Sequence, residues 1–388
     1  MNKLNLFFLF LILTQALTAQ AYIWKAQNTW DESWEKKYSE WISSEVTPQF
    51  FIQNNISTDC ADAVISLRWI FSRINSLPAA STTGSSLTSN LSGQWDNLST
   101  QVDWKKDLRF QAALKEINSS TDTKSLYKDL YPIKLNTQFL APGAIYINAT
   151  QSSGHAEWVA KNSFDGINNP IVFYSSTVPK QVRETLVYPF MKTKWPEKNA
   201  HSFMRFRWAI QSATSVQLKA MTDMPGYSTE QFDLAAQYSG TYDFDDFVTA
   251  RLIGQPLDGL RKLQNLVSYL AQRIENRVPV VEAGFKACQK GCAPESSLFY
   301  SHSTYSRDYA IQFLIIGITE LIYSDKYVHN VDDQLAGQMV LRWSQLQNDI
   351  VIDLGFKQVA LGILVNNWNQ SLISSDPNKS VNQRWGFD

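Results

Sequence analysis

The first third of the chain carries apolar residues at helical spacing. Residues 31–43, DESWEKKYSEWIS, place apolar side chains every three or four positions, and residues 60–75 repeat the pattern until Leu77-Pro78 ends it. A third, shorter stretch over residues 105–117 follows the same period. Residues 79–103 are rich in Ser, Thr, Asn and Gly, which predicts a long surface excursion between the helices.

The period of the apolar positions then changes to that of a β-strand. Residues 144–148 (AIYIN), 155–161 (HAEWVAK) and 170–177 (PIVFYSST) predict three short strands. Gly143 and Gly154 mark the turns that precede the first two. The first half of the chain therefore predicts helices followed by a small antiparallel sheet.

From about residue 227 onward the pattern is helical again. The predicted helices cover residues 256–278 (ended by Pro279), 306–325, 334–352 and 356–369. The pattern as a whole predicts an α+β fold in two domains. An α+β domain spans residues 22–225, with 79–103 as an insertion, and a helical domain spans residues 226–388.

The N-terminus has the organisation of a secretory signal peptide over residues 1–21. Lys3 precedes the apolar run LFFLFLILTQAL, and Ala19-Gln20-Ala21 supplies a small-x-small cleavage site. This pattern predicts a secreted or periplasmic protein that begins at Tyr22, and a retained membrane anchor is the alternative. No later run is apolar enough to predict a span, since Glu320 interrupts the best candidate.

Charge and composition narrow the classes of partner. The 388 residues include 35 basic and 36 acidic ones, a formal net charge of −1, which argues against a nucleic-acid binder. The 13 Trp, 21 Phe and 16 Tyr are enough to form a large hydrophobic core. The alternative is that some of these aromatic residues line a groove that binds an extended polymer.

The three cysteines differ in their surroundings. Cys288 and Cys292 lie close together in ACQKGCAPE, where Gly291 and Pro294 bend the chain, so a disulfide between them is predicted for an exported protein. Cys60 is then left as a free thiol. It is either a catalytic nucleophile or a buried, inert core residue.

The residues around Cys60 favour the nucleophile. Thr58 and Asp59 are good N-cap residues, which predicts Cys60 in the first turn of its helix. There the helix dipole favours a thiolate. Asp59 and Asp62 oppose this effect by like charge, so a nearby cation is required.

His155 is the predicted general base and acid. It stands at the head of a predicted strand directly after a glycine turn, whereas His201, His302 and His329 lie in polar segments. A third polar residue normally orients the imidazole ring. Asp165 is the preferred candidate, with an ordinary role in a turn as its alternative, and the other candidates are Asn162, Asn168, Asn169, Ser175 and Ser176.

Several further residues are candidates for binding a substrate. Asp59, Asp62, Trp158 and Arg307 are the predicted contacts, and for Arg307 a solvated ion pair at a helix start is the alternative. A carboxylate of an acidic peptide would suit one of three other arginines, among which the sequence does not choose, namely Arg183, Arg205 and Arg207.

Neither a metal site nor a cofactor site is predicted. The closely spaced cysteine pair has no histidine near it, and the chain contains no H-E-x-x-H motif. A metal bound by Cys60 and a histidine is therefore the weakest of the hypotheses. The oligomeric state is not predicted.

These residues resemble the NlpC/P60 branch of the papain-like cysteine peptidases. Asp59-Cys60-Ala61-Asp62 is similar to the family's D-C-[SA]-x nucleophile motif, and Gly154-His155 resembles its base motif. Residues 142–147 (PGAIYI) are similar to its P-G-D-hydrophobic strand, with Ala144 in place of the Asp. The resemblance covers roughly residues 54–180. It implies a papain-like fold and an exported enzyme that cleaves peptides of the cell wall.

Two alternatives stand beside this resemblance. Residues 59–79 (DCADAVISLRWIFSRINSLPA) and 155–165 (HAEWVAKNSFD) also resemble the transglutaminase-like branch of the same superfold, which implies acyl transfer or proteolysis. The other alternative is an exported protein that binds a peptide or glycan on this fold without catalysis.

Overall fold

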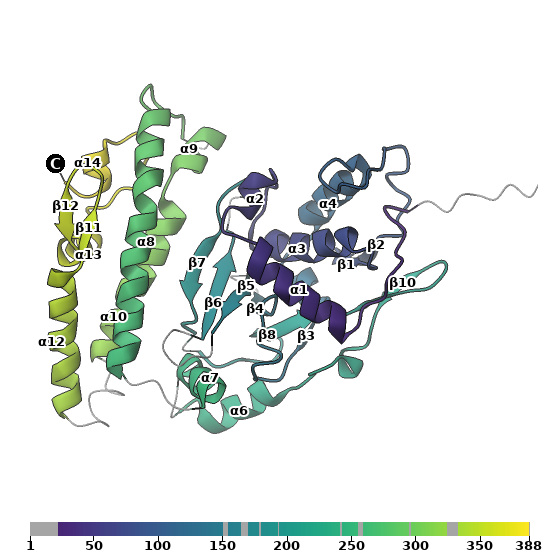
Figure 1. Ribbon diagram of the computed structural model, residues 1–388, viewed down its shortest axis with the longest axis horizontal. Coiled ribbons are helices and arrows are strands. Elements are labelled where there is room, and N and C mark those ends of the chain that lie inside the picture. The colour runs from purple at the N-terminus through teal and green to yellow at the C-terminus, as the bar shows by residue number, and fades with distance from the viewer. Residues whose placement is uncertain are drawn as a thin grey trace, which may run out of the picture.

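The computed structural model describes residues 22–149, 154–163, 170–177, 180–192, 194–240, 243–254, 259–294, 296–323 and 333–387. The fold is α+β, as predicted: an antiparallel sheet with its helices stands beside a set of long helices (Figure 1). The predicted signal peptide and Asp165 lie outside the described residues.

One six-stranded antiparallel sheet organises the N-terminal half, with the strand order β3-β8-β4-β5-β6-β7. The three predicted strands are confirmed as β4, β5 and β6, at its centre. The others were not predicted, because β3 and β7 are only three and four residues long and β8 lacks a clear alternation of apolar and polar residues. The strands are β3 (Leu130–Pro132), β4 (Ile145–Ala149), β5 (Gly154–Asn162), β6 (Ile171–Ser175), β7 (Leu186–Pro189) and β8 (His201–Phe206).

Helix α3 (Cys60–Ile74) contacts β5 and is buried along almost its whole length. Its start is fixed by a capping box: the Asp62 N–H donates to the Asp59 side chain, and the Asp59 N–H donates to the Asp62 carboxylate. Cys60 is therefore the first residue of the helix, as predicted. The surrounding helices are α1 (Glu32–Glu45), α2 (Phe50–Gln53), α4 (Leu108–Ser120) and α5 (Thr123–Lys128).

The prediction of a surface excursion over residues 79–103 is wrong at its beginning. Strands β1 (Ala80–Thr83) and β2 (Ser86–Ser89) form a hairpin there. Ser81 is buried and accepts a hydrogen bond of 2.6 Å from Trp69 of α3, while buried Asn90 donates to Gln211. Tertiary hydrogen bonds thus tie this polar segment to the core, and composition alone does not reveal them. Gln211 belongs to a second hairpin, β9 (Ala209–Gln211) and β10 (Val216–Leu218).

The division between the two halves falls later in the chain than predicted. After the turn η1 (Met221–Asp223), α6 (Glu230–Tyr238) and α7 (Phe244–Ile253) pack with the sheet, and Leu252 still belongs to its hydrophobic core. The second core begins at Leu263. The boundary thus lies between Leu252 and Leu263, rather than at residue 225.

The C-terminal half is mainly helical. Helix α8 (Gly259–Ala287) continues through Pro279, contrary to prediction, because Val281 beyond it is buried in the second core and Gly284 packs against Arg384. In the part of the chain that is described, no helix is long and apolar enough to cross a bilayer. The other elements are α9 (Ser297–His302), α10 (Tyr305–Tyr323), α12 (Asp333–Asp349), β11 (Val351–Asp353), β12 (Gln358–Ala360), α13 (Leu361–Asn369) and α14 (Val381–Arg384).

A buried ion pair joins α8 to α10 inside this half. Arg277 is fully buried, and its Nε lies 2.5 Å from a carboxylate oxygen of Asp308. The same guanidinium donates to the backbone oxygens of Ser374 and Arg384 and faces the ring of Trp385. One arginine thus connects two helices to the C-terminal segment.

We expect Asp308→Ala to destabilise the protein by about 3–5 kcal/mol, because it leaves the buried Arg277 charge without its carboxylate. Urea unfolding followed by circular dichroism measures the change. Lys36→Ala is the control, since the Lys36–Glu40 pair is solvent-exposed and 4.0 Å long. A loss below about 1 kcal/mol for Asp308→Ala would contradict this assignment.

Candidate active site

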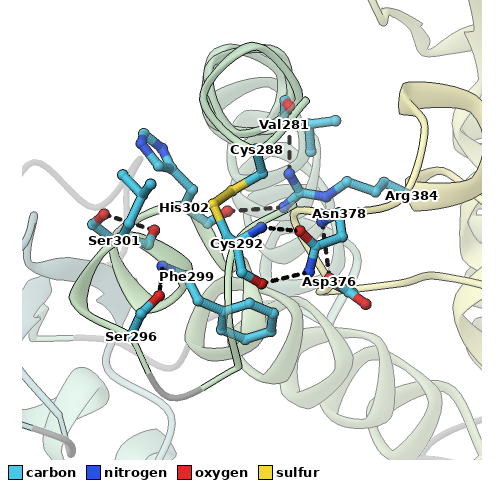
Figure 2. Close-up of a disulfide and its surroundings, with 11 residues drawn as sticks. Val281, Cys288, Cys292, Ser296, Phe299, Ser301, His302, Asp376, Asn378 and Arg384 are labelled. Atoms are coloured by element: carbon cyan, nitrogen blue, oxygen red, sulfur yellow. Dashed lines mark hydrogen bonds between the residues drawn. A yellow bond between two sulfur atoms is a disulfide. The ribbon is translucent and has the colours of Figure 1, made fainter. Parts of the chain in front are cut away.

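Cys60 is the one free cysteine among the described residues. Its side chain is largely buried, at 8% exposure, where the segment after α2 enters α3. The predicted Cys288–Cys292 disulfide is confirmed (Figure 2), so those two sulfurs are occupied. Whatever thiol chemistry the described chain can perform therefore belongs to Cys60.

His155, the second residue of β5, is the partner of Cys60. The two side chains are far apart in sequence but lie close enough for Cys60 to raise the pKa of His155. Ser175 of the neighbouring strand β6 lies 3.0 Å from Nε2 of His155. Since the Ser175 hydroxyl donates its proton to the Ser176 backbone oxygen, Ser175 Oγ is positioned to accept from Nε2.

Glu157 supplies the negative charge next to His155. The two residues are two positions apart on β5 and therefore point to the same side of the sheet. An Oε2 to Nε2 distance of 3.7 Å separates them, and the Glu157 side chain is completely buried. Lys192, which follows β7, places its Nζ 2.7 Å from the other carboxylate oxygen. The sequence analysis missed Glu157, although the two-residue period of the predicted strand would have pointed to it.

The surroundings of His155 favour its protonated form. Desolvation alone would lower its pKa, but the hydrogen bonds and charges of Cys60 and Glu157 outweigh it and raise the pKa to about 9. For Glu157, desolvation acts to raise the pKa, and the charges of Lys192 and His155 prevail and lower it. The arrangement thus combines an imidazolium with a carboxylate that stays ionised.

Asp59 and Asp62 form the capping box at the start of α3, and the substrate contact of half-buried Asp59 stays a prediction. Asp62 is fully buried, and the Lys180 ammonium lies 2.8 Å from its carboxylate. Burial raises the pKa of Asp62 to about 6, while the bond from Lys180 acts to lower it. Lys180 therefore reduces the negative charge near Cys60 that the sequence analysis identified as unfavourable. The predicted substrate contact of Asp62 is wrong, because its side chain is inaccessible.

Two backbone hydrogen bonds hold the entrance to α3. Thr58 and Gln181 pair as an isolated antiparallel bridge, with N–O distances of 3.0 and 3.2 Å. Ser176, at the end of β6, donates its hydroxyl proton to the Thr58 backbone oxygen. The strand that carries Ser175 and the helix that carries Cys60 are thereby fixed to each other.

The remaining predicted site residues lie elsewhere. Trp158 is 1% exposed and packs between Phe51 and Tyr174, so it is a core residue and its predicted substrate contact is wrong. Arg307 forms an ion pair with Glu184 between the two halves. Asp165, the preferred orienting residue, falls outside the described residues.

One acidic cluster has ligand spacing for a cation among the described residues, and it lies on α7 and its N-cap: Asp243, Asp245 and Asp246. The ammonium of Lys262 lies within ion-pair distance of both Asp245 and Asp246. A cation is thus already in place, so these residues give no reason to assign a metal.

Comparisons with known proteins were made for the whole sequence. No protein-family model matches it. No curated protein and no solved structure matches it either. The papain-like and transglutaminase-like resemblances remain predictions from motifs, and the function has to be argued from the geometry around Cys60.

Proposed function

We propose that the protein is an exported cysteine hydrolase that cleaves amide bonds in peptides. The proximity of Cys60 to His155, which raises the pKa of the imidazole, is the observation that supports it most. A free thiol at the first residue of a helix, beside an imidazole held by a serine and a carboxylate, has the parts of an activated nucleophile. The resemblance to NlpC/P60 peptidases suggests peptides of the cell wall as the substrate.

In this mechanism the Cys60 thiolate attacks the carbonyl carbon of the scissile amide. The Asp62 N–H of the first turn of α3 is taken by the capping box, so the backbone N–H groups of Cys60 and Ala61 are the ones that stabilise the oxyanion. Nδ1 of His155 is the nitrogen that exchanges a proton with the Cys60 sulfur, because Nε2 faces Ser175 and Glu157. The imidazolium gives its proton to the leaving amine, and the neutral ring then takes a proton from the water that hydrolyses the thioester.

Acyl transfer to an amine is the second candidate, and the burial of Cys60 is the observation that favours it. Because Cys60 is only 8% exposed, water has restricted access to a thioester formed there. The same thioester would then react with a primary amine, as the transglutaminase-like resemblance suggests. Adding a labelled alkylamine to a hydrolysis reaction separates the two candidates, because only acyl transfer incorporates the label.

We expect iodoacetamide to label Cys60 at pH 6 at least about tenfold faster than it labels a model thiol, because the nearby imidazolium stabilises the thiolate. Mass spectrometry of the intact chain follows the reaction at this single free thiol. His155→Gln should remove the acceleration. His201→Gln is the matched control, since the His201 ring lies on β8 and contacts the Trp195 backbone oxygen.

The non-catalytic alternative makes the opposite prediction for the same experiment. If Cys60 reacts no faster than the model thiol, or if His155→Gln leaves its rate unchanged, the nucleophile assignment fails. Binding of a peptide or glycan without catalysis would then be the better description.

A further inference from the structure

A cavity of about 390 Å³ lies at the edge of the sheet that β3 and β8 form, and we call it the edge cavity. One face of helix α1 lines it, together with Tyr131 of β3, Arg205 of β8 and residues of the segment 138–141. This edge is at the opposite end of the sheet from β7, the strand that α8 and α10 contact (Figure 1). Neither Cys60 nor His155 lines the edge cavity, so it is separate from the candidate active site.

Arg205 is a buried residue that brings available N–H groups to the edge cavity. It is 6% exposed, and its Nη2 donates to Oγ of Ser39 at 2.9 Å and to the Pro142 backbone oxygen at 3.4 Å. Within the described chain, its Nε and Nη1 donate to no acceptor, and no carboxylate lies within ion-pair distance of its guanidinium. Donors in such a position are unfavourable without an acceptor, which a ligand in the cavity would supply.

The structure distinguishes among the three arginines that the sequence offered for a carboxylate. Arg207 donates to three backbone oxygens, through Nε, Nη1 and Nη2, so the fold already uses its guanidinium. Arg183 lines a larger cavity between the two halves of the protein, where the carboxylates of Glu184 and Asp376 also lie. Arg205 is therefore the candidate that we retain.

Glu35 of α1 provides an available acceptor in the same cavity. Its side chain is 12% exposed, and its Oε1 accepts hydrogen bonds from the Arg68 guanidinium and from Nε1 of Trp208. Its Oε2 accepts no hydrogen bond from any residue that the structure describes. The edge cavity thus presents donors from one buried side chain and an acceptor from another.

Two connections place the charged groups of Arg205 and Glu35 near each other. Ser39, which accepts from Arg205, lies one turn after Glu35 on α1, and residues at this spacing are neighbours on a helix surface. Trp208, which donates to Glu35 at 2.9 Å, follows Arg205 by three residues. Both side chains are described, and no ion pair joins them. A ligand that carries a carboxylate and an ammonium therefore fits between them.

The charges around the edge cavity are balanced. The lining holds two carboxylates and two cations, whose formal charges cancel: Glu32, Glu35, Lys36 and Arg205. The partners of Glu35 and Lys36 outside the lining, Arg68 and Glu40, add one further charge of each sign. This balance favours a zwitterion over an anion, because the two charges of a zwitterion meet opposite charges of the site.

The rest of the cavity wall includes apolar groups that are held in place. Trp208, Phe139 and Pro225 line it, and Trp208 is buried. The Phe139 ring lies against Gly226, where an added Cβ would be 2.4 Å from the ring, and the Tyr131 hydroxyl donates to the Pro225 backbone oxygen. A volume of about 390 Å³ is at the lower end for small-molecule sites, so it suits one amino acid better than a longer peptide.

We propose that the edge cavity binds a free α-amino acid with an apolar or aromatic side chain. The carboxylate of the ligand accepts from Nε and Nη1 of Arg205, and its ammonium donates to Oε2 of Glu35. Both charged groups are attached to one carbon atom, so they reach the two partners at once. The ligand side chain packs against Trp208 and Phe139. The site does not include Cys60, and the inference goes beyond the proposed hydrolase.

Isothermal titration calorimetry of the full chain tests the binding with three related ligands. L-Phenylalanine carries both charges, N-acetyl-L-phenylalanine lacks the ammonium, and L-phenylalaninamide lacks the carboxylate. We expect each derivative to bind at least about tenfold more weakly than phenylalanine, because hydrogen bonds between charged groups are strong. Equal affinity for phenylalanine and either derivative, or no binding at about 10 mM phenylalanine, would overturn the inference.

Arg205→Met tests the residue that binds the carboxylate. The variant should bind phenylalanine and its amide with equal affinity, and it leaves no buried carboxylate unpaired, because Arg205 forms no ion pair within the described chain. Lys36→Met is the matched control, since Lys36 is an exposed lining cation, 4.0 Å from Glu40. The control should keep the preference for phenylalanine over the amide. A preference that persists in Arg205→Met, or that Lys36→Met removes, would contradict the assignment.

Ala141→Leu tests the location of the site without changing any charge. Ala141 lines the edge cavity, so the larger side chain fills part of it, and the affinity for phenylalanine should fall at least about tenfold. Circular dichroism shows whether the variant keeps its fold. Unchanged affinity in a folded Ala141→Leu protein would mean that the amino acid binds elsewhere. The alkylation rate of Cys60 reports on the hydrolase alone, so the two proposals fail separately.

Discussion

Cys60→Ala should abolish peptide cleavage, with a fall in rate of about 10⁴-fold or more, because no other free thiol among the described residues can form the acyl intermediate. Digestion of a pool of synthetic peptides, with product detection by mass spectrometry, measures the loss.

A structural explanation of that loss can be tested separately. Removing the sulfur at the first residue of α3 leaves its capping box in place, so the melting temperature should change by only a few degrees. Ser43→Ala, at an exposed position of α1, is a control for handling of the variants. Residual cleavage by Cys60→Ala at more than about a tenth of the wild-type rate would contradict the role of Cys60.

Glu157→Gln is expected to have the second largest effect, on stability and on the pKa of His155, because the buried Glu157 carboxylate interacts with two cations, Lys192 and protonated His155. We expect a loss of about 3–5 kcal/mol in the free energy of unfolding, since Lys192 keeps its charge without a partner. The pKa of His155 should fall from about 9 towards its usual range. An NMR titration of the ring measures the pKa, and urea unfolding measures the stability.

The pH dependence of stability follows from the same carboxylate. The raised pKa of His155 contributes stability that is fully present below its unfolded pKa of 6.5 and is lost as the pH rises through about 9. The lowered pKa of Glu157 also contributes stability. This contribution is present at a pH above the pKa that Glu157 has in the unfolded chain, and it is lost as the pH falls through the pKa of the folded state. The difference between wild type and Glu157→Gln should therefore be largest near neutral pH and shrink towards pH 9–10.

A double variant separates the two roles of Glu157. Glu157→Gln with Lys192→Met removes the unpaired ammonium, so most of the lost stability should return while the pKa of His155 stays low. Unchanged His155 titration in either variant would show that Glu157 does not act on the ring. The carboxylate would then be a structural partner of Lys192 alone.

Local signals in the sequence identified the parts of the site that depend on neighbouring residues. The Thr58-Asp59 cap located the start of α3, and the two-residue period located β5 with His155 at its head. The same period contained the information for Glu157. Glu157 was not predicted as a site residue, because the role of a buried carboxylate within a strand becomes clear only when the cation that pairs with it is known.

The contacts that complete the site join segments far apart in the chain. Lys180 reaches Asp62, and Lys192 reaches Glu157, across loops whose path no local pattern fixes. The preference for Asp165 followed from proximity in sequence, whereas Ser175 faces His155 because β5 and β6 pair in a particular register. Register depends on the packing of whole faces of the sheet.

The sequence by itself determined the α+β class, the central strands, the cap at Cys60 and the Cys288–Cys292 disulfide, because each depends on residues close in the chain. Only the tertiary structure decided that Cys60 lies next to His155 and that the Glu157 carboxylate lies 3.7 Å from Nε2 of the ring. Those contacts depend on the docking of helices against a sheet. Docking is set by buried surface and charge that come from all parts of the chain.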